Sequence, residues 1–301
     1  MFLSCICIVL LPLVLLQVSV GADDGTRDNR LTSVHVQQTD HPVQYQIRET
    51  LTLVSLNVAH GRGTSLNQIF VSHGKTKVNL RQIADFLNEA DADIVALQEA
   101  DGPSWWSGSF DHVYFLAKGG NYPQFIHELH AYVWIGHYGT GVLSRLPIRS
   151  GYALTFPPSL PTTRKGFTLA EIEWLTGANT VIIDVVSVHL DFSRKSVRKE
   201  QLKVMRDTLL KRNHPMIIMG DFNSEWIADQ LTQENTGDSV SLHTVSDGGK
   251  NLDTYKHKRL DWILASTVFS IDAYEVSPHR LSDHLAVVAK IRLASGSTDP
   301  Q

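Results

Sequence analysis

The chain has 301 residues, of which 43% are hydrophobic and 19% charged, enough apolar material for the core of one large soluble domain or two small ones. Its formal net charge of −4 excludes the strongly basic balance that is typical of proteins that bind nucleic acid without sequence specificity. Both cysteines, Cys5 and Cys7, fall in the first 22 residues, so a chain that loses this segment has no disulfide, thiolate metal site or cysteine nucleophile.

Residues 1–22 form an apolar block without a charged side chain. The block ends in the small residues Val20 and Ala22, at the spacing of a cleavage site. This pattern predicts a secretory signal peptide, although the basic residues that usually open one are missing, and hence a secreted or periplasmic protein. The alternative is a retained membrane anchor, because about 18 apolar residues just span a bilayer. Pro12 in the middle of the block favours cleavage.

The rest of the chain consists mostly of strand-like runs. Residues 23–48 are polar and predict a loose N-terminal lead-in, and residues 295–301 predict a flexible tail. No Pro/Ser-rich linker, repeat or low-complexity block divides residues 49–294, so we expect one domain there. Runs rich in Val, Ile and aromatic residues predict strands at residues 51–58, 93–98, 112–117, 140–145, 167–174, 180–190, 216–220, 260–265 and 284–293.

Two segments have helical rather than strand-like spacing. Apolar residues recur on one face in residues 79–87 and again in residues 196–209. Each segment lies between predicted strands, which favours crossover connections in a mixed sheet. Many strands and few helices predict an α/β fold with two packed sheets and helices outside them. A basic run in residues 194–199 is interpreted as the solvated face of the second helix, with a local basic patch as the alternative.

Polar side chains stand at the ends of several of these apolar runs. They are Asn57, Glu99, His189, Asp221, Asn223, Asp261, Asp283 and His284. Burying such a group without a partner costs about 2–7 kcal/mol, so this many isolated polar groups would be hard to accommodate. Side chains at like ends of neighbouring strands converge on one crevice, and we therefore expect these residues to form one site.

Each of these residues taken alone also has a purely structural explanation. The alternatives are turn capping for Asn57 and for the pair Asp283-His284, a loop carboxylate for Glu99, a hydrogen-bonded core histidine for His189 and an Asx turn for residues 221–224. The functional hypothesis depends on the residues coming together in space.

Carboxylate and carboxamide oxygens, without cysteine, suit a hard divalent cation such as Mg²⁺, with Mn²⁺ or Ca²⁺ as alternatives. A zinc site would need cysteine or clustered histidine, and the pair His127 and His130, at helical spacing, is interpreted as structural or as a surface pair. His189 and His284, with carboxylates to fix their tautomers, can orient a water and move protons. The chemistry that this combination suits best is attack of water on a phosphorus ester.

Short motifs follow one another along the chain: LNVAHGRG (56–63), ADIVALQE (92–99), GVLSRLPI (141–148), SVHLD (187–191), MGDFNS (219–224), RLDWIL (259–264) and LSDHLAV (281–287). In this order and spacing they resemble the endonuclease/exonuclease/phosphatase superfamily. That group includes pancreatic-type deoxyribonuclease, exonuclease III, inositol polyphosphate 5-phosphatases and secreted sphingomyelinases. The resemblance covers residues 51–293, and GDFN and SDH are its most specific motifs.

The resemblance implies a four-layer α/β sandwich, in which two mixed β-sheets pack face to face with helices on the outside. By matching positions, it makes Asn57 and Glu99 metal ligands and places Asp283 at the metal. It assigns Asp221 to orienting or deprotonating the attacking water. Asn223 is the donor that would hold the scissile phosphate, a role that suits an amide better than a second carboxylate.

Four further roles come from the same resemblance. His284, paired with Asp261, would bind phosphate or act in acid–base catalysis, and His189 would lie near the leaving group. Arg164, in TTRKGF before a strand, would reach a phosphate oxygen, with a surface arginine as the alternative.

The sequence also departs from the pattern of its relatives. Many of them carry Gly-Asn before the LSR strand, where this chain has Tyr-Gly-Thr-Gly at residues 138–141, so one phosphate-contacting amide is absent from this position. His60 occupies a position that is often non-polar or aromatic; it would cap its loop or line the site.

The motifs specify the reaction better than the substrate, because substrate specificity lies in loops. Predicted export, the charge balance and the loop pair Trp105-Trp106, which can also pack in a core, favour a phosphodiesterase or phosphomonoesterase. Its expected substrate is a phospholipid or sphingolipid head group, reached by peripheral membrane contact. An exported nuclease acting on nucleic acid is the runner-up, and a non-catalytic binding module is the alternative of another class. We expect a monomer without an obligate protein partner.

Overall fold

The computed structural model describes residues 30–177, 179–225, 241–246, 248 and 250–294. The predicted signal peptide and the predicted tail therefore lie outside the described residues. Among the described residues, no helix is long and apolar enough to cross a membrane.

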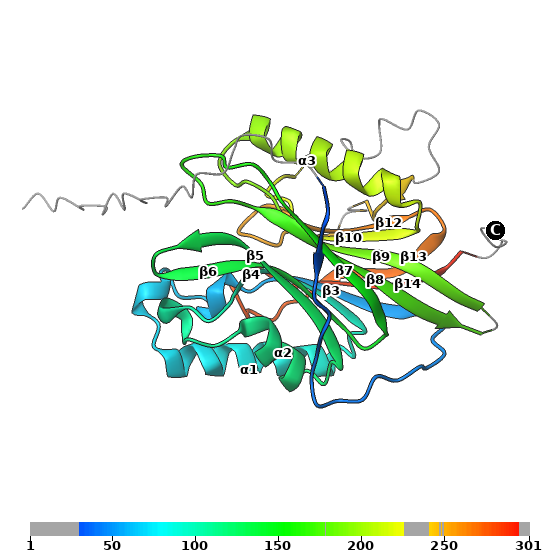
Figure 1. The fold of residues 1–301 in the computed structure, drawn as a ribbon, viewed down its shortest axis with the longest axis horizontal. Coiled ribbons are helices and arrows are strands. Elements are labelled where there is room, and N and C mark those ends of the chain that lie inside the picture. Colours follow the sequence, from blue (N-terminus) through cyan, green and yellow to red (C-terminus); the bar gives the residue numbers. More distant parts are fainter. Residues whose placement is uncertain (1–29, 178, 226–240, 247, 249, 295–301) are drawn as a thin grey trace, which may run out of the picture.

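Two mixed sheets of seven strands each form the centre of the molecule (Figure 1). In spatial order, the first sheet contains β1 (Thr32–Val34), β7 (Ile148–Thr155), β8 (Gly166–Thr176), β9 (Asn179–His189), β10 (Met216–Asp221), β12 (Asp261–Ser266) and β11 (Leu242–His243). The second sheet contains β13 (Phe269–Val276), β14 (Val287–Leu293), β3 (Leu51–Asn57), β4 (Ile94–Asp101), β6 (Gly136–Ser144), β5 (Gln124–Val133) and β2 (Gln37–Gln38).

Helices cover the outer faces of both sheets. Figure 1 shows α3 (Lys195–Leu209) on one side of the molecule, and α1 (His73–Glu89) and α2 (His112–Gly119) on the other. Four short 3₁₀ helices complete the described elements: η1 (Ala59–Gly61), η2 (Gln68–Phe70), η3 (Trp105–Ser107) and η4 (Leu210–Arg212). The predicted four-layer α/β sandwich is confirmed.

The central strands are apolar on both faces because both faces are covered. In β3, Leu51 and Leu53 point into the cluster between the sheets, whereas Val54 and Leu56 pack under α1 and α2. Alternate residues of a strand face opposite sides of its sheet, so a fully buried strand reads as a continuous apolar run. This is why the sequence predicts the central strands well.

The prediction of a strand at residues 112–117 is wrong, because this segment belongs to α2. Asp111 caps the helix by accepting a hydrogen bond from the Tyr114 amide, and Val113, Leu116 and Ala117 are buried on one face. A run of six residues is too short for its periodicity to separate a helix from a strand. The histidines at 127 and 130, by contrast, lie on strand β5 rather than on a helix.

The polar lead-in also contributes structure that its composition does not indicate. β1 pairs with β7 and β2 pairs with β5, so residues 30–48 supply an edge strand to each sheet. These strands are two and three residues long and mostly exposed. Backbone pairing holds them, and backbone pairing leaves little trace in an apolar pattern.

Candidate active site

The predicted polar residues meet where the central strands of both sheets end. β3 runs parallel to β4, and β9 runs parallel to β10, so the carboxyl ends of the two strands in each pair lie side by side. Asp221, at the end of β10, is the register partner of both His189 on β9 and Asp261 on β12. Three neighbouring strands of the first sheet thus bring a carboxylate, an imidazole and a second carboxylate to one level.

Asp221 lies at the centre of this group and is 1% exposed. Its Oδ2 accepts a hydrogen bond from Asn57 Nδ2 at 3.1 Å, and Asn57 comes from the second sheet. The same oxygen lies 3.6 Å from His189 Nε2 and 3.9 Å from His284 Nε2. The site therefore spans the interface between the sheets.

Burial and the nearby Asp261 carboxylate raise the pKa of Asp221 to about 7. A carboxylate loses solvation when it is buried, and a second negative charge disfavours its ionised form further. A group with a pKa near neutrality exchanges a proton with water most effectively at physiological pH. Asp221 thus has the environment that a general base needs.

His284 pairs with Asp261 in the wall of the site. Its Nδ1 donates to Asp261 Oδ2 at 2.8 Å, and its ring lies 4.7 Å from the ring of Tyr255. Burial alone would lower the pKa of His284, but the carboxylates of Asp261 and Asp221 raise it to about 10. The histidine is therefore a cation at neutral pH and presents its Nε2–H toward Asp221.

Glu99 is turned toward the site by a β-bulge. Gln98 and Ala100 pair with consecutive residues of β6, and Glu99 between them adopts a left-handed conformation with φ of 50°. Burial favours the neutral acid, but the neighbouring His60, His189 and Lys165 outweigh it and lower the pKa of Glu99. The side chain is 21% exposed, so an ionised carboxylate faces the mouth of the site.

His60 lines the site rather than only capping its loop. Its Nε2 lies 3.5 Å from Glu99 Oε2, and its Nδ1 lies 2.7 Å from Asp101 Oδ1. The ring packs against Trp106, with centroids 4.9 Å apart, and edge-on against Tyr138 at 4.6 Å. Of the predicted loop tryptophans, Trp106 is thus part of the site wall, whereas Trp105 is 72% exposed.

Asn223 follows β10 and shapes the turn after Asp221. Its backbone amide donates to Asp221 Oδ1 at 2.9 Å, and its side-chain Nδ2 donates to the Leu190 carbonyl at 3.0 Å. These bonds form the Asx turn that the sequence offered as an alternative, and they hold the catalytic candidate in place. The role of the Asn223 amide toward a phosphate stays a prediction.

Among the described residues, neither Asp283 nor Arg164 forms a hydrogen bond or ion pair with this group. Asp283 Oδ2 instead accepts from Arg62 Nη2 at 2.6 Å, which ties the loop after β3 to the loop before β14. Arg164 is half-buried in the loop before β8. The roles that the resemblance implies for these two residues stay predictions.

Sequence reasoning missed Lys165, the neighbour of Arg164. Lys165 is buried, and its Nζ lies 3.4 Å from His189 Nδ1. Burial lowers the pKa of this amine, and the carboxylates of Glu99, Asp221 and Asp191 oppose the change. Its position directly before a buried strand is the same signal that singled out the other site residues.

A family model of the endonuclease/exonuclease/phosphatase family matches residues 54–284. The chain belongs to the endonuclease/exonuclease/phosphatase family. Members of this family are usually phosphoesterases or nucleases. The matched range contains all the predicted site residues, and no curated protein matches the chain.

Solved structures of family proteins share the fold at low sequence identity. A protein from Beutenbergia cavernae is 19% identical with a TM-score of 0.62, and the match covers 82% of this chain and 72% of that one. The human Nocturnin catalytic domain with bound sulfate is 16% identical at a TM-score of 0.61, covering 87% and 98%. A mannosyl-6-phosphatase from Bacteroides thetaiotaomicron is 15% identical at 0.57, covering 81% and 99%.

Enzymes of this family generally use divalent metals, and the site offers suitable donors. Ligand atoms of Asp221, Asp261 and His284 lie within 4.8 Å of one another. Asp261 Oδ1 is buried and has no hydrogen-bond partner among the described residues. Because His284 is protonated, the donors of this cluster are the Asp221 and Asp261 carboxylates, and together with the ionised Glu99 they fit a divalent cation of the kind that prefers hard ligands.

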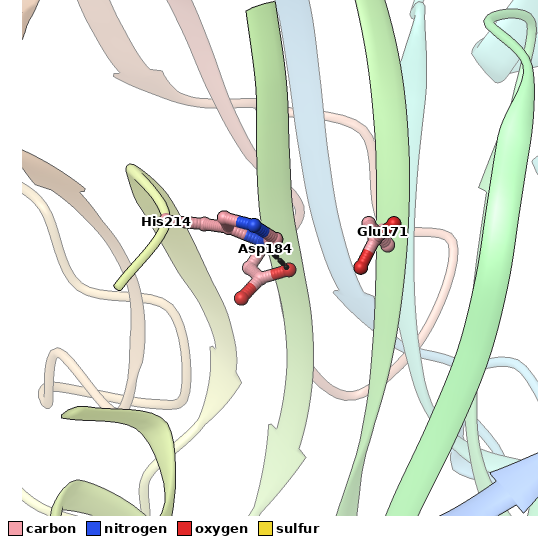
Figure 2. A group of neighbouring side chains, drawn as sticks. All are labelled: Glu171, Asp184 and His214. Atoms are coloured by element: carbon pink, nitrogen blue, oxygen red, sulfur yellow. Dashed lines mark hydrogen bonds and ion pairs between the residues drawn. The ribbon is translucent and has the colours of Figure 1, made fainter. Parts of the chain in front are cut away.

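A second acidic cluster lies away from the site on the outer part of the first sheet. Figure 2 shows Glu171, Asp184 and His214, whose ligand atoms lie within 4.8 Å of one another. Arg212 donates to both carboxylates, at 2.6 Å to Glu171 and 2.6 Å to Asp184. The guanidinium already pairs with both carboxylates, so the cluster is an ion-pair network that ties η4 to β8 and β9.

Proposed function

We propose that the protein is an exported phosphoesterase that hydrolyses a phosphodiester, or a phosphomonoester, by metal-assisted attack of water. The observation that carries this proposal is the position of Asp221. It is a buried carboxylate with a pKa of about 7, held by Asn57 from the opposite sheet and faced by two histidines. Family membership supports the reaction class.

Different side chains of the site would perform different parts of the reaction. A divalent cation at Glu99 would supply positive charge to the phosphate oxygens. Asp221 accepts a proton from the attacking water, and the Asn57 amide holds the carboxylate in place. The cationic His284 binds a phosphate oxygen through its Nε2–H, because Asp261 occupies its other ring nitrogen.

His189 is the candidate donor to the leaving group. Burial and the Lys165 ammonium lower its pKa well below the usual range, so the ring is neutral. Lys165 donates to Nδ1, which places the single ring proton on Nε2, the nitrogen that faces Glu99 and Asp221. A neutral imidazole with its proton directed into the site can hydrogen-bond a departing oxygen.

We propose a lipid head group as the substrate, supported by exposed apolar side chains around the site. They form an apolar rim on three adjoining segments: Leu66, Ile69, Phe70, Trp105, Tyr132 and Trp134. His73 bonds the Trp105 carbonyl, and Gln68 bonds the Trp106 carbonyl, which joins the first two segments. Exposed aromatic residues of this kind favour the interface between lipid and water.

The basic run at the start of α3 is the feature that favours the runner-up, a nuclease. Two of its members bind their own chain, however. Arg194 Nη2 donates to the Ser159 carbonyl and Arg198 Nη1 donates to the Asp191 carbonyl. The run thus supports a phosphate-tracking groove less strongly than the apolar rim supports a lipid surface.

The test is an assay of the mature protein with Mg²⁺, Mn²⁺ or Ca²⁺ against a chromogenic phosphodiester, sphingomyelin and phosphatidylcholine vesicles, DNA, RNA and inositol phosphates. We expect metal-dependent hydrolysis of the chromogenic diester and of a vesicle lipid. Faster cleavage of DNA or RNA than of lipid would establish the nuclease instead. If none of these substrates is hydrolysed, the alternative of a non-catalytic binding module is supported instead.

Substituting Asp221→Asn should lower kcat by roughly 10²–10⁴-fold, because an amide of the same shape cannot accept the proton from water. The measurement is steady-state hydrolysis of the chromogenic diester at saturating metal. Asp272→Asn is the matched control, since Asp272 is exposed and pairs with Arg292 across β13 and β14, away from the site. Equal rates for the two variants would contradict the proposed role of Asp221.

A further inference from the structure

A histidine stands on each side of the Glu99 carboxylate. His60 Nε2 lies 3.5 Å from Glu99 Oε2, and His189 Nε2 lies 3.8 Å from Glu99 Oε1. A neutral imidazole nitrogen either carries a proton and donates, or carries a lone pair and can bind a metal ion. The partner of the other ring nitrogen decides between the two.

For His189 the partner is an amine. Lys165 Nζ, 3.4 Å from Nδ1, has protons to donate, so Nδ1 accepts and the ring proton lies on Nε2. The nitrogen that faces Glu99 is then a donor. His189 therefore cannot serve as a ligand to a cation on that carboxylate.

For His60 the partner is a carboxylate, and the assignment is reversed. Asp101 Oδ1 lies 2.7 Å from His60 Nδ1 and can only accept, so Nδ1 carries a proton, and Nε2 offers its lone pair once a cation displaces any proton from it. Asp101 is fully buried, and its Oδ2 also accepts from Trp106 Nε1 at 2.7 Å. The carboxylate and the ring are thus fixed in position.

We propose that His60 Nε2 is a ligand of the divalent cation held by Glu99, and that Asp101 is the positioning residue that orients it. The inference rests on the proposed metal dependence and goes beyond it, because the resemblance implies ligands through oxygen only. Ligands about 2.1 Å from one ion are about 3–4 Å apart, and the 3.5 Å between Nε2 and Oε2 falls in this range. A carboxylate–histidine–metal row is the usual way in which proteins present an imidazole ligand.

The ion pair between Asp283 and Arg62 also favours His60 as a ligand. Arg62 holds the Asp283 carboxylate at 2.6 Å, so an oxygen donor implied at the metal is directed to an arginine instead. His60 supplies a nitrogen 3.5 Å from Glu99 Oε2. An imidazole ligand shifts preference toward first-row transition ions and away from Mg²⁺ and Ca²⁺. We therefore expect Mn²⁺ to bind more tightly than Mg²⁺.

The test is electron spin echo spectroscopy of the mature protein loaded with Mn²⁺. This method detects nitrogen bound directly to the ion. The wild-type protein should show an imidazole nitrogen coupling. His60→Asn should abolish it, and His189→Asn should retain it. Asparagine suits position 60 because His60 has a left-handed backbone, with φ of 56°, that asparagine adopts readily. Thermal melts establish that each variant is folded.

Calorimetric titration with Mn²⁺ and with Mg²⁺ gives a second readout. His60→Asn should weaken Mn²⁺ binding much more than Mg²⁺ binding, and Asp101→Asn should weaken Mn²⁺ binding by roughly 10–100-fold. A nitrogen coupling that persists in His60→Asn, or that is absent from the wild type, overturns the inference. Hydrolysis without nitrogen coupling refutes only the ligand assignment, whereas coupling without hydrolysis refutes only the proposed function.

Discussion

Buried charges at the site are held in place by specific partners. Asp221 shares its oxygens between Asn57 and the turn after β10, and Asp261 shares its carboxylate with His284. Each of these groups would be costly to bury alone, and the partners offset that cost. The partners therefore tie the stability of the protein to pH.

The pair His284–Asp261 should stabilise the fold in a defined pH window. The pKa of His284 is raised to about 10 when folded, against about 6.5 when unfolded. A raised pKa contributes stability that is fully present below about pH 6.5 and is lost as the pH rises through about 10. The free energy of unfolding of the wild type, measured in urea, should therefore fall between pH 7 and 10.

His284→Asn should show a flatter profile over the same window, because it lacks the titrating group. His35→Asn, at an exposed histidine far along the chain, is the control and should follow the wild type. A parallel decline in all three proteins would mean that other groups cause the pH dependence.

The sequence indicated these residues through their position at strand ends, which is a backbone property. It did not indicate Lys165 or Asp101 as partners, because their contacts depend on the direction of each side chain in the folded chain. Asp101 lies two residues beyond Glu99, and the bulge at Glu99 changes which side the residues after it face. No periodicity in the sequence records that change.

At the scale of the element, β10 depends on the absence of a side chain at one position. Gly220 has φ of 151°, and a Cβ there would lie 2.0 Å from the Val188 carbonyl oxygen on β9. The two parallel strands approach closely just before they present Asp221 and His189. Glycine is thus what lets the strand pair carry both groups to the same level.

Gly220→Ala should destabilise the protein by more than about 1 kcal/mol and lower kcat, because backbone must move to relieve the contact. Gly74→Ala, the same change in α1 with nothing within 4 Å, should instead stabilise it by about 0.5–1 kcal/mol. Denaturant unfolding measures both. A Gly220→Ala variant as stable as the wild type would show that β9 and β10 can separate at no cost.

The elements differ in how far the sequence reveals them. α1, α3 and the central strands bury long apolar faces, so periodicity indicates them. β5, β7 and β13 are partly exposed or carry polar residues, and their pairing with neighbours rather than their own composition makes them strands. The two-sheet architecture follows from the first group alone.

At the scale of the whole molecule, the apolar rim and the site lie at the same edge of the sheets. Trp105 follows β4, which carries Glu99 near its end, and Trp134 lies in the turn between β5 and β6. His60 and Trp106 are in contact at the wall between rim and site. A lipid surface bound by the rim would therefore present head groups to the catalytic residues.

The double variant Trp105→Ser/Trp134→Ser should reduce hydrolysis of vesicle lipid by at least about tenfold, since each buried aromatic contributes roughly 1.5–3 kcal/mol to interfacial binding. Hydrolysis of the soluble chromogenic diester should stay unchanged. Tyr45→Ser, at an exposed residue before the start of β3, is the control. Equal losses on both substrates would mean that the tryptophans support the site and not a lipid surface.

The bulge in β4 explains how the Glu99 carboxylate is accommodated in the sheet. Gln98 pairs with Thr140 and Ala100 pairs with Gly139, which are neighbours on β6, so Glu99 has no register partner of its own. Deleting this single codon would leave Gln98 and Ala100 as successive positions of a regular ladder. Glu99 is thus an extra residue in β4, and a chain without it would keep the pairing of β4 with β6 but lose the proposed metal ligand.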